Sequence, residues 1–545
     1  MKYKLHKNNE KRNDFAKADE EYLGGEKMKK LGLAFIMSML AIVLVACSSD
    51  KEAGDGKKED AKKELRVAYN AQPPTLDPMI TTAVATRDVA RHVFETLLTL
   101  NRNFEIEPML AESYEVSEDG KEIIFTLREG IKFHNGEEMT ADDVVSSMNR
   151  WKEASSLGNS YFENAKFEKV DDKTVVLHLE ERLFTALHML ADPGQAAVIT
   201  PATSNEGTSE EGIKEYIGTG PFKFVDWKSD QYILLEKFED YQSVESEPSG
   251  LAGKKEAKVD EIYFEFVTDS STRLAGIQTG EYDIVNAVPF DNAEQLESNK
   301  DVKNIIEHNG FNGIVFNKKA GLFKDVVARQ AVNAALSEED ILTAAFTSDR
   351  FYELEHGLMI KDQVEWYSEA GKEQYNQNNP EKAKELLKQA GYNGEEIIIL
   401  TSKDYEDHYN AAVVVQHQLE AIGMTVRLDI YDWPTVLQKR TEEQAYDIFV
   451  TGFPTEPIPT KYVFLDSKTN WPGWTNDPLL DELVEGINKA ASQEEAQELF
   501  AQLQAEFYEY LPMIKFGNKT TITTVRSNVE GMDFLQGIVL WNVDK

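Results

Sequence analysis

Hydrophobic and polar positions between residues 397 and 451 predict strands and helices in alternation. Short apolar runs rich in β-branched residues are typical of buried strands, and apolar positions recurring every three to four residues are typical of helices. The strands are expected at 397–400, 426–430 and 447–451, with helices at 411–422 and 434–440. This β-α-β-α-β order produces a parallel sheet through right-handed crossovers. The pattern therefore predicts an α/β fold.

Two helix starts carry clear capping signals. Thr140 precedes an apolar-periodic stretch with Asp143 three residues later, and Asn379 precedes Pro380, which suits the first helical position. Ligands in open α/β sheets bind beyond the carboxyl ends of the strands. We therefore expect the loops 401–404 and 452–456 to face a ligand cleft.

Composition excludes several classes of protein. The 545 residues contain 58 basic and 96 acidic side chains, a net charge of −38, which argues against nucleic-acid binding. The single cysteine, Cys47, excludes intramolecular disulfides, thiolate zinc sites and iron–sulfur clusters. No GxSxG, HExxH, P-loop or GxGxxG motif occurs in the mature chain, and the histidines are scattered. We expect neither an enzyme nor a metal site or cofactor.

The head of the chain has the layout of an exported protein. An apolar stretch at 31–46 follows Lys27, Lys29 and Lys30 and ends in Leu-Val-Ala-Cys at Cys47. This ending resembles a bacterial lipobox, in which the cysteine is diacylated and becomes the first mature residue. We expect a signal peptide over 1–46, translation beginning at Met28, and a lipidated Cys47 opening a flexible tether over 47–63.

Five runs in the rest of the chain resemble the family 5 extracellular solute-binding proteins. These are the dipeptide, oligopeptide, glutathione and nickel receptors of bacterial ABC importers. The runs, which agree in order and spacing, are LAESYEVSEDG (110–120), FTLREGIKFHNG (125–136), TADDVV (140–145), GTGPFKF (218–224) and RLAGIQTGEYDI (273–284). The resemblance spans essentially residues 64–545.

The resemblance implies a type II periplasmic-binding-protein fold, with two lobes, a ligand cleft between them and an extra subdomain in the first lobe. We expect the hinge crossings near 307–312 and 512–518. Lobe I then comprises 64–308 and 515–545, and lobe II comprises 309–514. The implied protein is a monomer that serves importer permease subunits from the outer face of the cytoplasmic membrane of a Gram-positive bacterium. Its only contact with the membrane is the lipid anchor.

The loop 452–456 lies where peptide receptors of this family carry a Gly-aromatic-x-x-Asp segment, whose Asp receives the ligand's α-ammonium. Glu456 takes that position here, and Lys403 matches the position of the Arg that takes the α-carboxylate in dipeptide receptors. The alternative interpretation of Glu456 and of Lys403 is an ordinary solvated loop residue. The expected ligand-binding residues are Glu456, Lys403, Gly452, Phe453, Thr455, Tyr69 and Trp474.

Arg87 and Arg91, one helical turn apart, offer a possible second anion site, but pairing with Asp88 and Glu95 is the simpler interpretation. The expected function is capture of small peptides for import. The alternatives are a receptor for nickel, a metal chelate or glutathione, an extracellular chaperone, a peptide-sensing receptor and, less favoured, a secreted hydrolase.

Overall fold

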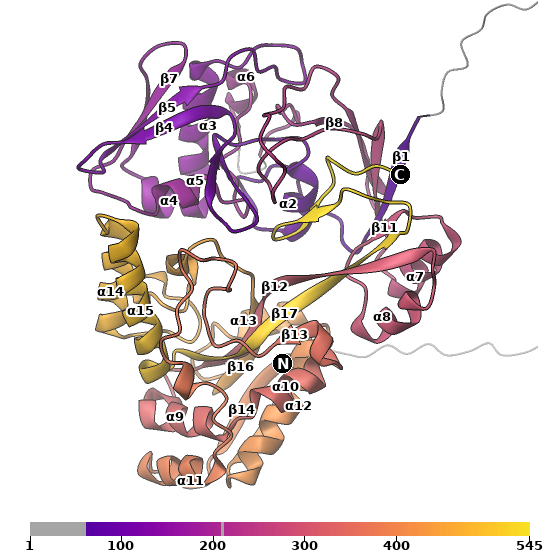
Figure 1. Ribbon diagram of the computed structural model, residues 1–545. Coiled ribbons are helices and arrows are strands. Elements are labelled where there is room, and N and C mark those ends of the chain that lie inside the picture. The colour runs from indigo at the N-terminus through magenta and orange to yellow at the C-terminus, as the bar shows by residue number, and fades with distance from the viewer. Residues whose placement is uncertain (1–61, 209–211) are drawn as a thin grey trace, which may run out of the picture. The chain divides into compact units, whose positions relative to one another are not determined.

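The computed structural model describes residues 62–208 and 212–545, and Lys62–Lys545 form one compact unit (Figure 1). Our predictions for the signal peptide, for Cys47 and for nearly all of the tether lie outside the described residues.

A mixed sheet of eleven strands forms the framework of this unit. Its order is β15-β14-β16-β12-β17-β11-β1-β10-β9-β8, with β13 paired to β17. The strands are β1 (Glu64–Tyr69), β8 (Phe222–Lys228), β9 (Tyr232–Lys237), β10 (Glu261–Phe266), β11 (Ile284–Val285), β12 (Val302–Phe316), β13 (Tyr352–Glu353), β14 (Glu396–Ser402), β15 (Thr425–Tyr431), β16 (Ile448–Phe453) and β17 (Met513–Arg526).

The two longest strands, β12 and β17, pair with each other in the middle of this order and divide it into two lobes (Figure 1). We call the side with β11, β1 and β8–β10 the first lobe, and the side with β14–β16 the second lobe. The register of β12 on β17 shifts between His308 and Phe311 and again between Asn312 and Gly313. The expected crossings near 307–312 and 512–518 coincide with this region. The lobe boundaries themselves stay a prediction.

The first lobe also holds a separate four-stranded antiparallel sheet, β4-β5-β7-β6, in the part we expected to form an extra subdomain. Thr140 caps α3 in a capping box with Asp143, as predicted. The remaining elements of this lobe are α2 (Val84–Ala90), β2 (Leu98–Leu100), β3 (Ile106–Pro108), β4 (Ala111–Val116), β5 (Glu122–Leu127), α3 (Ala141–Ala154), α4 (Ser156–Phe162), β6 (Lys166–Lys169), β7 (Thr174–His178), α5 (Ala186–Leu190), α6 (Ala202–Asn205), α7 (Ser270–Thr279), α8 (Phe290–Glu297), β18 (Asp533–Phe534) and β19 (Ile538–Val539).

The second lobe contains the predicted β-α-β-α-β unit. β14 pairs in parallel with both β15 and β16, so the expected parallel sheet is confirmed. Asn379 caps α11 through its side chain, with Pro380 in the first turn, as the sequence indicates. The helices of this lobe are α9 (Val326–Ala335), α10 (Glu338–Phe346), α11 (Pro380–Gln389), α12 (Glu406–Ala421), α13 (Trp433–Lys439), α14 (Pro478–Lys489) and α15 (Gln493–Tyr510), with short 3-10 turns η1 (Leu322–Lys324), η2 (Asp349–Phe351), η3 (Lys372–Gln374), η4 (Pro459–Lys461) and η5 (Ser467–Thr469).

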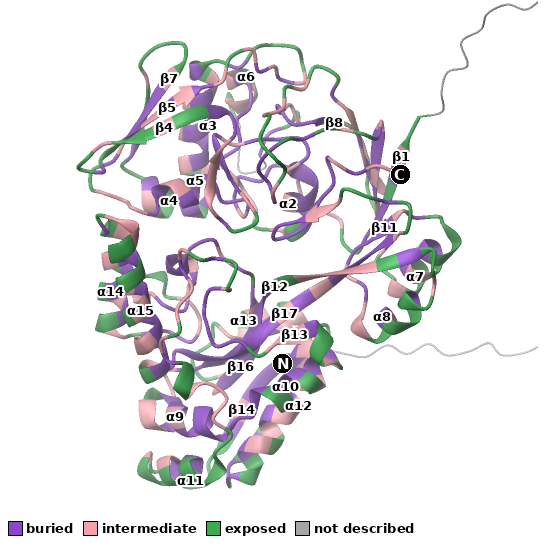
Figure 2. Ribbon diagram, viewed as in Figure 1, coloured by how far each residue is buried: buried purple, intermediate pink, exposed green. Residues whose placement is uncertain are grey.

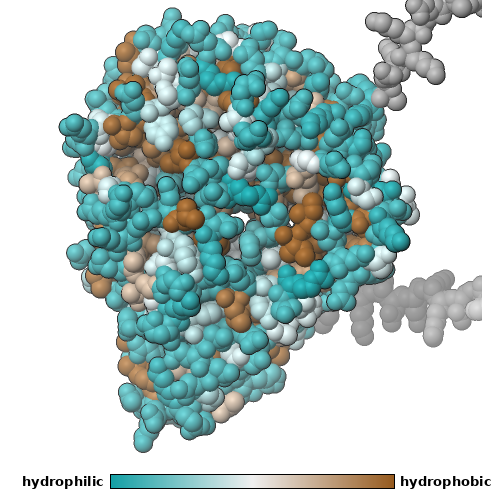
Figure 3. Space-filling model, viewed as in Figure 1, coloured by the Kyte–Doolittle hydropathy of each residue, from teal (hydrophilic) through white to brown (hydrophobic). Residues whose placement is uncertain are grey.

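Burial follows this architecture. The central strands are largely buried, whereas the outer faces of α11, α14 and α15 are exposed (Figure 2). The surface in Figure 3 is mostly hydrophilic, with small separate apolar spots. Each helix in 62–208 and 212–545 is too short or too polar to span a bilayer.

Candidate functional site

A cavity of about 840 Å³ lies between the two lobes. Its walls come from residues 82–195 of the first lobe, residues 454–489 of the second lobe, and Gln536. A cavity of this size suits a small ligand that both lobes enclose. The buried or half-buried polar side chains in its walls are those of Arg87, Tyr161, Arg182, Asp192, Gln195, Glu456, Thr460, Lys461, Asp466, Asn488 and Gln536.

The loop after β16 presents Glu456 to this cavity. The Glu456 carbonyl accepts a hydrogen bond of 2.7 Å from Gln363 Nε2, and its backbone N–H donates to the Tyr462 hydroxyl at 3.4 Å. The Tyr462 ring stacks on Phe464 with ring centroids 5.3 Å apart. These contacts hold the backbone of the loop in place, so the Glu456 carboxylate is positioned by the interior of the second lobe.

Lys461 joins two carboxylates that come from different lobes. Its ammonium pairs with Glu456 at 2.7 Å and also with Asp192 of the first lobe. Asp192 is 1% exposed and also accepts the Gly194 N–H at 2.9 Å. Two carboxylates around one ammonium leave one excess negative charge at this side of the cavity.

Burial sets the protonation of these groups. It raises the pKa of Glu456 above its usual value and Asp192 adds to the rise, whereas Lys461 and Arg87 oppose it. Burial disfavours the charged form of Lys461, but Asp192 and Glu456 outweigh that effect, so the pKa of Lys461 lies above its usual value. Lys461 is therefore charged at neutral pH.

Further contacts close the cavity at its rim. Lys489 at the end of α14 pairs with Glu181 at 2.7 Å, and the Phe184 N–H donates to the Asn488 carbonyl at 2.7 Å. Deeper in, Gln536 of the first lobe donates to the Thr455 carbonyl of the second. The structure thus has its lobes in contact on both sides of the cavity.

Lys403 does not share this cavity with Glu456. Both loops follow parallel strands at one sheet edge, as expected, but Lys403 is exposed and its ammonium lies 4.6 Å from the ring centroid of Tyr409. The structure therefore does not bring the two expected poles of a peptide clamp into one cavity.

The expected aromatic residues lie in the core. Tyr69 is 2% exposed and donates to Asp88 at 2.6 Å, and Phe453 packs in a cluster with Phe464 and other rings. Trp474 has a φ of 50° and stacks on Tyr446. None of these three lines the cavity. The aromatic side chain in the described cavity wall is Tyr161 of the first lobe.

Gly452 and Thr455 support the loop. A Cβ on Gly452 would lie 2.7 Å from Asn312 Oδ1 and 2.9 Å from Lys519 Nζ, so a larger residue there would require these side chains to shift. The Thr455 hydroxyl is buried without a hydrogen-bond partner among the described residues.

The interpretation of the two arginines needs one correction. Asp88 pairs with Arg87 at 3.4 Å and with Arg91 at 3.6 Å, as expected, but Glu95 pairs instead with Lys255 at 2.8 Å. Sequence spacing did not reveal that pairing, because Lys255 is 160 residues away.

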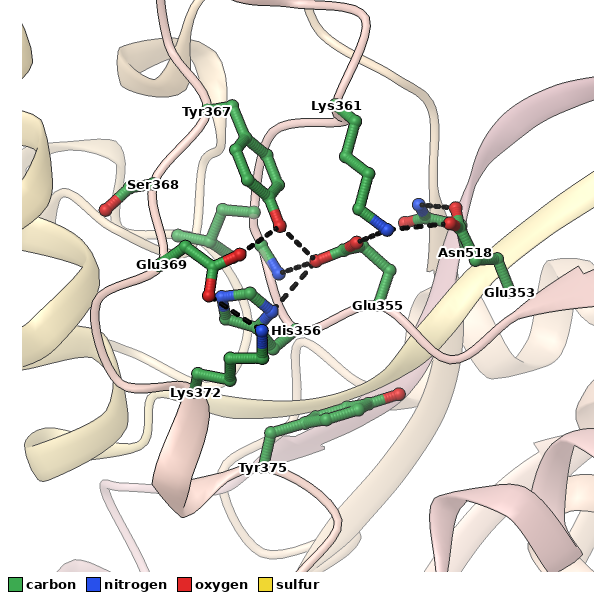
Figure 4. Close-up of polar contacts among 12 residues, drawn as sticks. Glu353, Glu355, His356, Lys361, Tyr367, Ser368, Glu369, Lys372, Tyr375 and Asn518 are labelled. Atoms are coloured by element: carbon green, nitrogen blue, oxygen red, sulfur yellow. Dashed lines mark hydrogen bonds and ion pairs between the residues drawn. The ribbon is translucent and has the colours of Figure 1, made fainter.

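A second buried polar cluster lies inside the second lobe (Figure 4). Its centre is Glu355, 2% exposed, which accepts from His356 at 2.9 Å, from Lys361 at 2.6 Å and from the Gly357 N–H at 3.0 Å. Burial alone would raise the pKa of Glu355, but these donors lower it well below its usual value. Among the described residues, no group of three or more His, Cys, Asp or Glu side chains could hold a metal ion, in this cluster or elsewhere.

The fold and the cavity between the lobes define a two-lobed binding protein. The sequence profile of the bacterial extracellular solute-binding proteins, family 5 (middle region), matches residues 105–474, and the chain belongs to this family.

Relatives match over most of their length. The chain is 27% identical to a probable peptide ABC transporter periplasmic-binding protein of Sinorhizobium fredii, covering 89% of the chain and 94% of the relative. It is 26% identical to the oligopeptide-binding protein AppA of Bacillus subtilis, covering 94% and 97%, and 26% identical to the glutathione-binding protein GsiB of Escherichia coli, covering 86% and 92%.

Solved structures share the fold. The agropinic-acid complex of AgaA from Agrobacterium (A. tumefaciens) has a TM-score of 0.73 at 27% identity, covering 88% of this chain and 98% of AgaA. NikZ of Campylobacter jejuni, solved with Ni(L-His), has a TM-score of 0.74 at 20% identity, covering 89% and 100%. The chain is thus a solute-binding component of an ABC importer, and not an enzyme.

Proposed function

We propose that the protein is a membrane-anchored receptor that captures small peptides and delivers them to an importer. The observation that carries the proposal is the half-buried Glu456 carboxylate in the wall of the cavity between the lobes. Asp192 and Glu456 together exceed the charge of Lys461 by one, so a ligand ammonium would restore neutrality there. The peptide-binding and oligopeptide-binding names of two relatives agree with this ligand class.

In this proposal Glu456 receives the α-ammonium of the peptide. A hydrogen bond between buried charges is commonly worth about 2–5 kcal/mol on truncation, because the partner's charge is left enclosed and unpaired. Glu456→Gln should therefore weaken binding of a free-amino tripeptide by at least about tenfold. The N-acetylated tripeptide should bind poorly to the parent and lose little more in the variant.

Calorimetry on this two-by-two set measures the coupling between Glu456 and the ammonium, since independent sites would give additive losses. Glu485→Gln is the matched control, because Glu485 lines the same cavity but is half exposed at its rim. Unchanged affinity in Glu456→Gln would remove Glu456 from the site. If no peptide binds but nickel, a nickel chelate or glutathione does, the ligand class changes and the receptor function stands.

The anchor is tested separately. If Cys47 carries the lipid, Cys47→Ala should release the protein into the medium or leave an uncleaved precursor. A variant that stays on the membrane at its normal mature size would place the anchor elsewhere. Fractionation followed by immunoblotting distinguishes these results.

A further inference from the structure

A second, smaller cavity adjoins the main one inside the first lobe. It has a volume of about 50 Å³ and shares Arg87 and Asp192 with the wall of the main cavity. At about 15 Å³ for each water, that volume holds about three waters, which is the size of a carboxylate group with its three heavy atoms. Its other charged wall residues are Arg91, Glu95 and Lys255.

Both arginines offer unused hydrogen-bond donors to this space. Arg91 is held by its Nη1, which donates to the Leu535 carbonyl at 3.0 Å and to the Gly537 carbonyl at 3.3 Å. Its buried Nη2 lies 3.6 Å from Asp88 Oδ1 and makes no hydrogen bond within 62–208 and 212–545. Arg87 donates from Nε to Asp88 at 3.4 Å, and neither of its Nη atoms donates to another described residue.

Asp192 of this wall is paired with Lys461, and without Asp192 the charges around the small cavity do not cancel. Asp88 is shared by both arginines and also accepts the Tyr69 hydroxyl, so the arginine pair keeps one excess positive charge. Glu95 is matched by Lys255 and accepts further from Thr219 and Tyr241.

The third carboxylate at this wall, Asp192, is paired with Lys461 across the main cavity. Positive charge therefore remains on the first-lobe side, at Arg87 and Arg91. Negative charge remains on the second-lobe side, at Glu456.

We propose that Arg87 and Arg91 form the site for a carboxylate of the ligand, and that this carboxylate occupies the small cavity while the ammonium lies at Glu456. The inference rests on the proposed peptide function and names the other pole of the ligand. Guanidinium groups suit the role because their planar forks bind carboxylates in a bidentate manner. Lys403, exposed over Tyr409, then takes no part in binding.

The test uses a pool of tripeptides Ala-X-Ala in three forms. These are the free acid with X apolar, the C-terminal amide with X apolar, and the C-terminal amide in which X is Asp. Peptides captured by the whole protein are identified by mass spectrometry, and calorimetry gives their affinities. For the wild-type protein we expect the free acid to bind at least about tenfold more tightly than the amide. This comparison needs no variant.

Arg87→Gln should weaken the free acid by about tenfold or more and leave the amide almost unchanged, and Arg87→Lys should recover part of the loss. Lys403→Gln is the matched control. Tight binding of the Asp-containing amide, lost in Arg87→Gln, would support the site with a side-chain carboxylate as its source.

Three outcomes overturn the inference. Equal affinities of acid and amide for the wild-type protein would show that no carboxylate is recognised. A loss in Lys403→Gln as large as that in Arg87→Gln would move the anion site to Lys403. If the wild-type protein captures no tripeptide of any form, the proposed peptide function fails and the inference fails with it. In the first two outcomes peptides still bind, so the peptide function stands and only the inference fails.

Discussion

The two buried ionic clusters of the second lobe differ in what surrounds them. Glu355 finds its donors His356, Lys361 and Gly357 within one stretch of the same lobe (Figure 4). Glu456 finds Lys461 in its own loop, but Lys461 also pairs with Asp192 of the opposite lobe. The first cluster keeps all its partners when the lobes separate, whereas the second loses one.

This difference separates stability from function. Removing one partner of a buried ion pair is costly because the remaining charge stays enclosed. Around Glu355 the partners all belong to one lobe, so opening of the lobes leaves them in place. Around Asp192 and Glu456, opening of the lobes admits water. Loss of a partner there therefore changes the equilibrium between the open and closed states rather than the free energy of unfolding.

The largest effect is expected for Glu355→Gln. Losing this carboxylate leaves the buried His356 ring and the Gly357 N–H without a charged acceptor, while the exposed Lys361 keeps Glu353, and we expect the free energy of unfolding to fall by about 1–3 kcal/mol. Denaturant titration measures it. Glu369→Gln is the control, because Glu369 is exposed at the edge of the same cluster. Equal effects of both substitutions would contradict a central role for Glu355.

Lys461→Met should act on the lobes rather than on folding. Asp192 and Glu456 would face each other without a cation between them, and their repulsion favours the open state. We expect a larger radius of gyration by small-angle scattering without ligand, and a change in unfolding free energy below about 1 kcal/mol. A large fall in the free energy of unfolding at an unchanged radius of gyration would show that this cluster, like that of Glu355, mainly stabilises the folded protein.

The interior of the second lobe should also give stability a pH dependence. Glu338 is fully buried, and burial raises its pKa to about 8 from a usual value of 4.5. Between these pH values the folded protein binds more protons than the unfolded chain, so the free energy of unfolding falls as pH rises from 4.5 to 8. Its share of the slope is at most about 1.4 kcal/mol per pH unit.

Glu338→Gln should remove that contribution. Lys515, whose pKa burial lowers to about 7, acts in the opposite direction above that pH, because the unfolded chain then binds the extra proton. Denaturation curves from pH 5 to about 7 compare wild type and variant in the window below the pKa of Lys515, where Glu338 dominates. If the free energies of unfolding of the two proteins changed with pH in the same way, Glu338 would not be protonated in the folded protein over this range.

The smallest effect is expected for Lys403→Gln. The side chain is exposed over Tyr409, outside both cavities, so tripeptide affinity should change by less than about twofold and stability by less than about 0.5 kcal/mol. A loss of about tenfold in affinity would show that topology alone had located the anion pole correctly.

The α/β class and the parallel unit of the second lobe could be predicted, because their strands and helices carry strong local patterns. Glu456 could be expected at a cleft because it follows a strand whose end was predicted. Asp192 and Lys461 could not, because their pairing joins positions 269 residues apart and neither has a local signal.

The aromatic residues illustrate a second limit. Tyr69 is the last residue of β1, which led us to expect it at the cleft. Its hydroxyl instead donates to Asp88, and its ring packs in the core. Trp474 lies in a turn whose left-handed backbone directs it onto Tyr446. The sequence shows how far such side chains can extend from the backbone. The direction in which they point depends on the neighbours against which they pack.

The last strands of the chain complete the lobe that the first strands begin. β11 pairs with β17, Arg91 donates to carbonyls at Leu535 and Gly537, and the Leu540 N–H donates to His92. During synthesis these contacts cannot form until nearly the whole chain has left the ribosome. The order of the chain therefore delays completion of the first lobe to the end of translation.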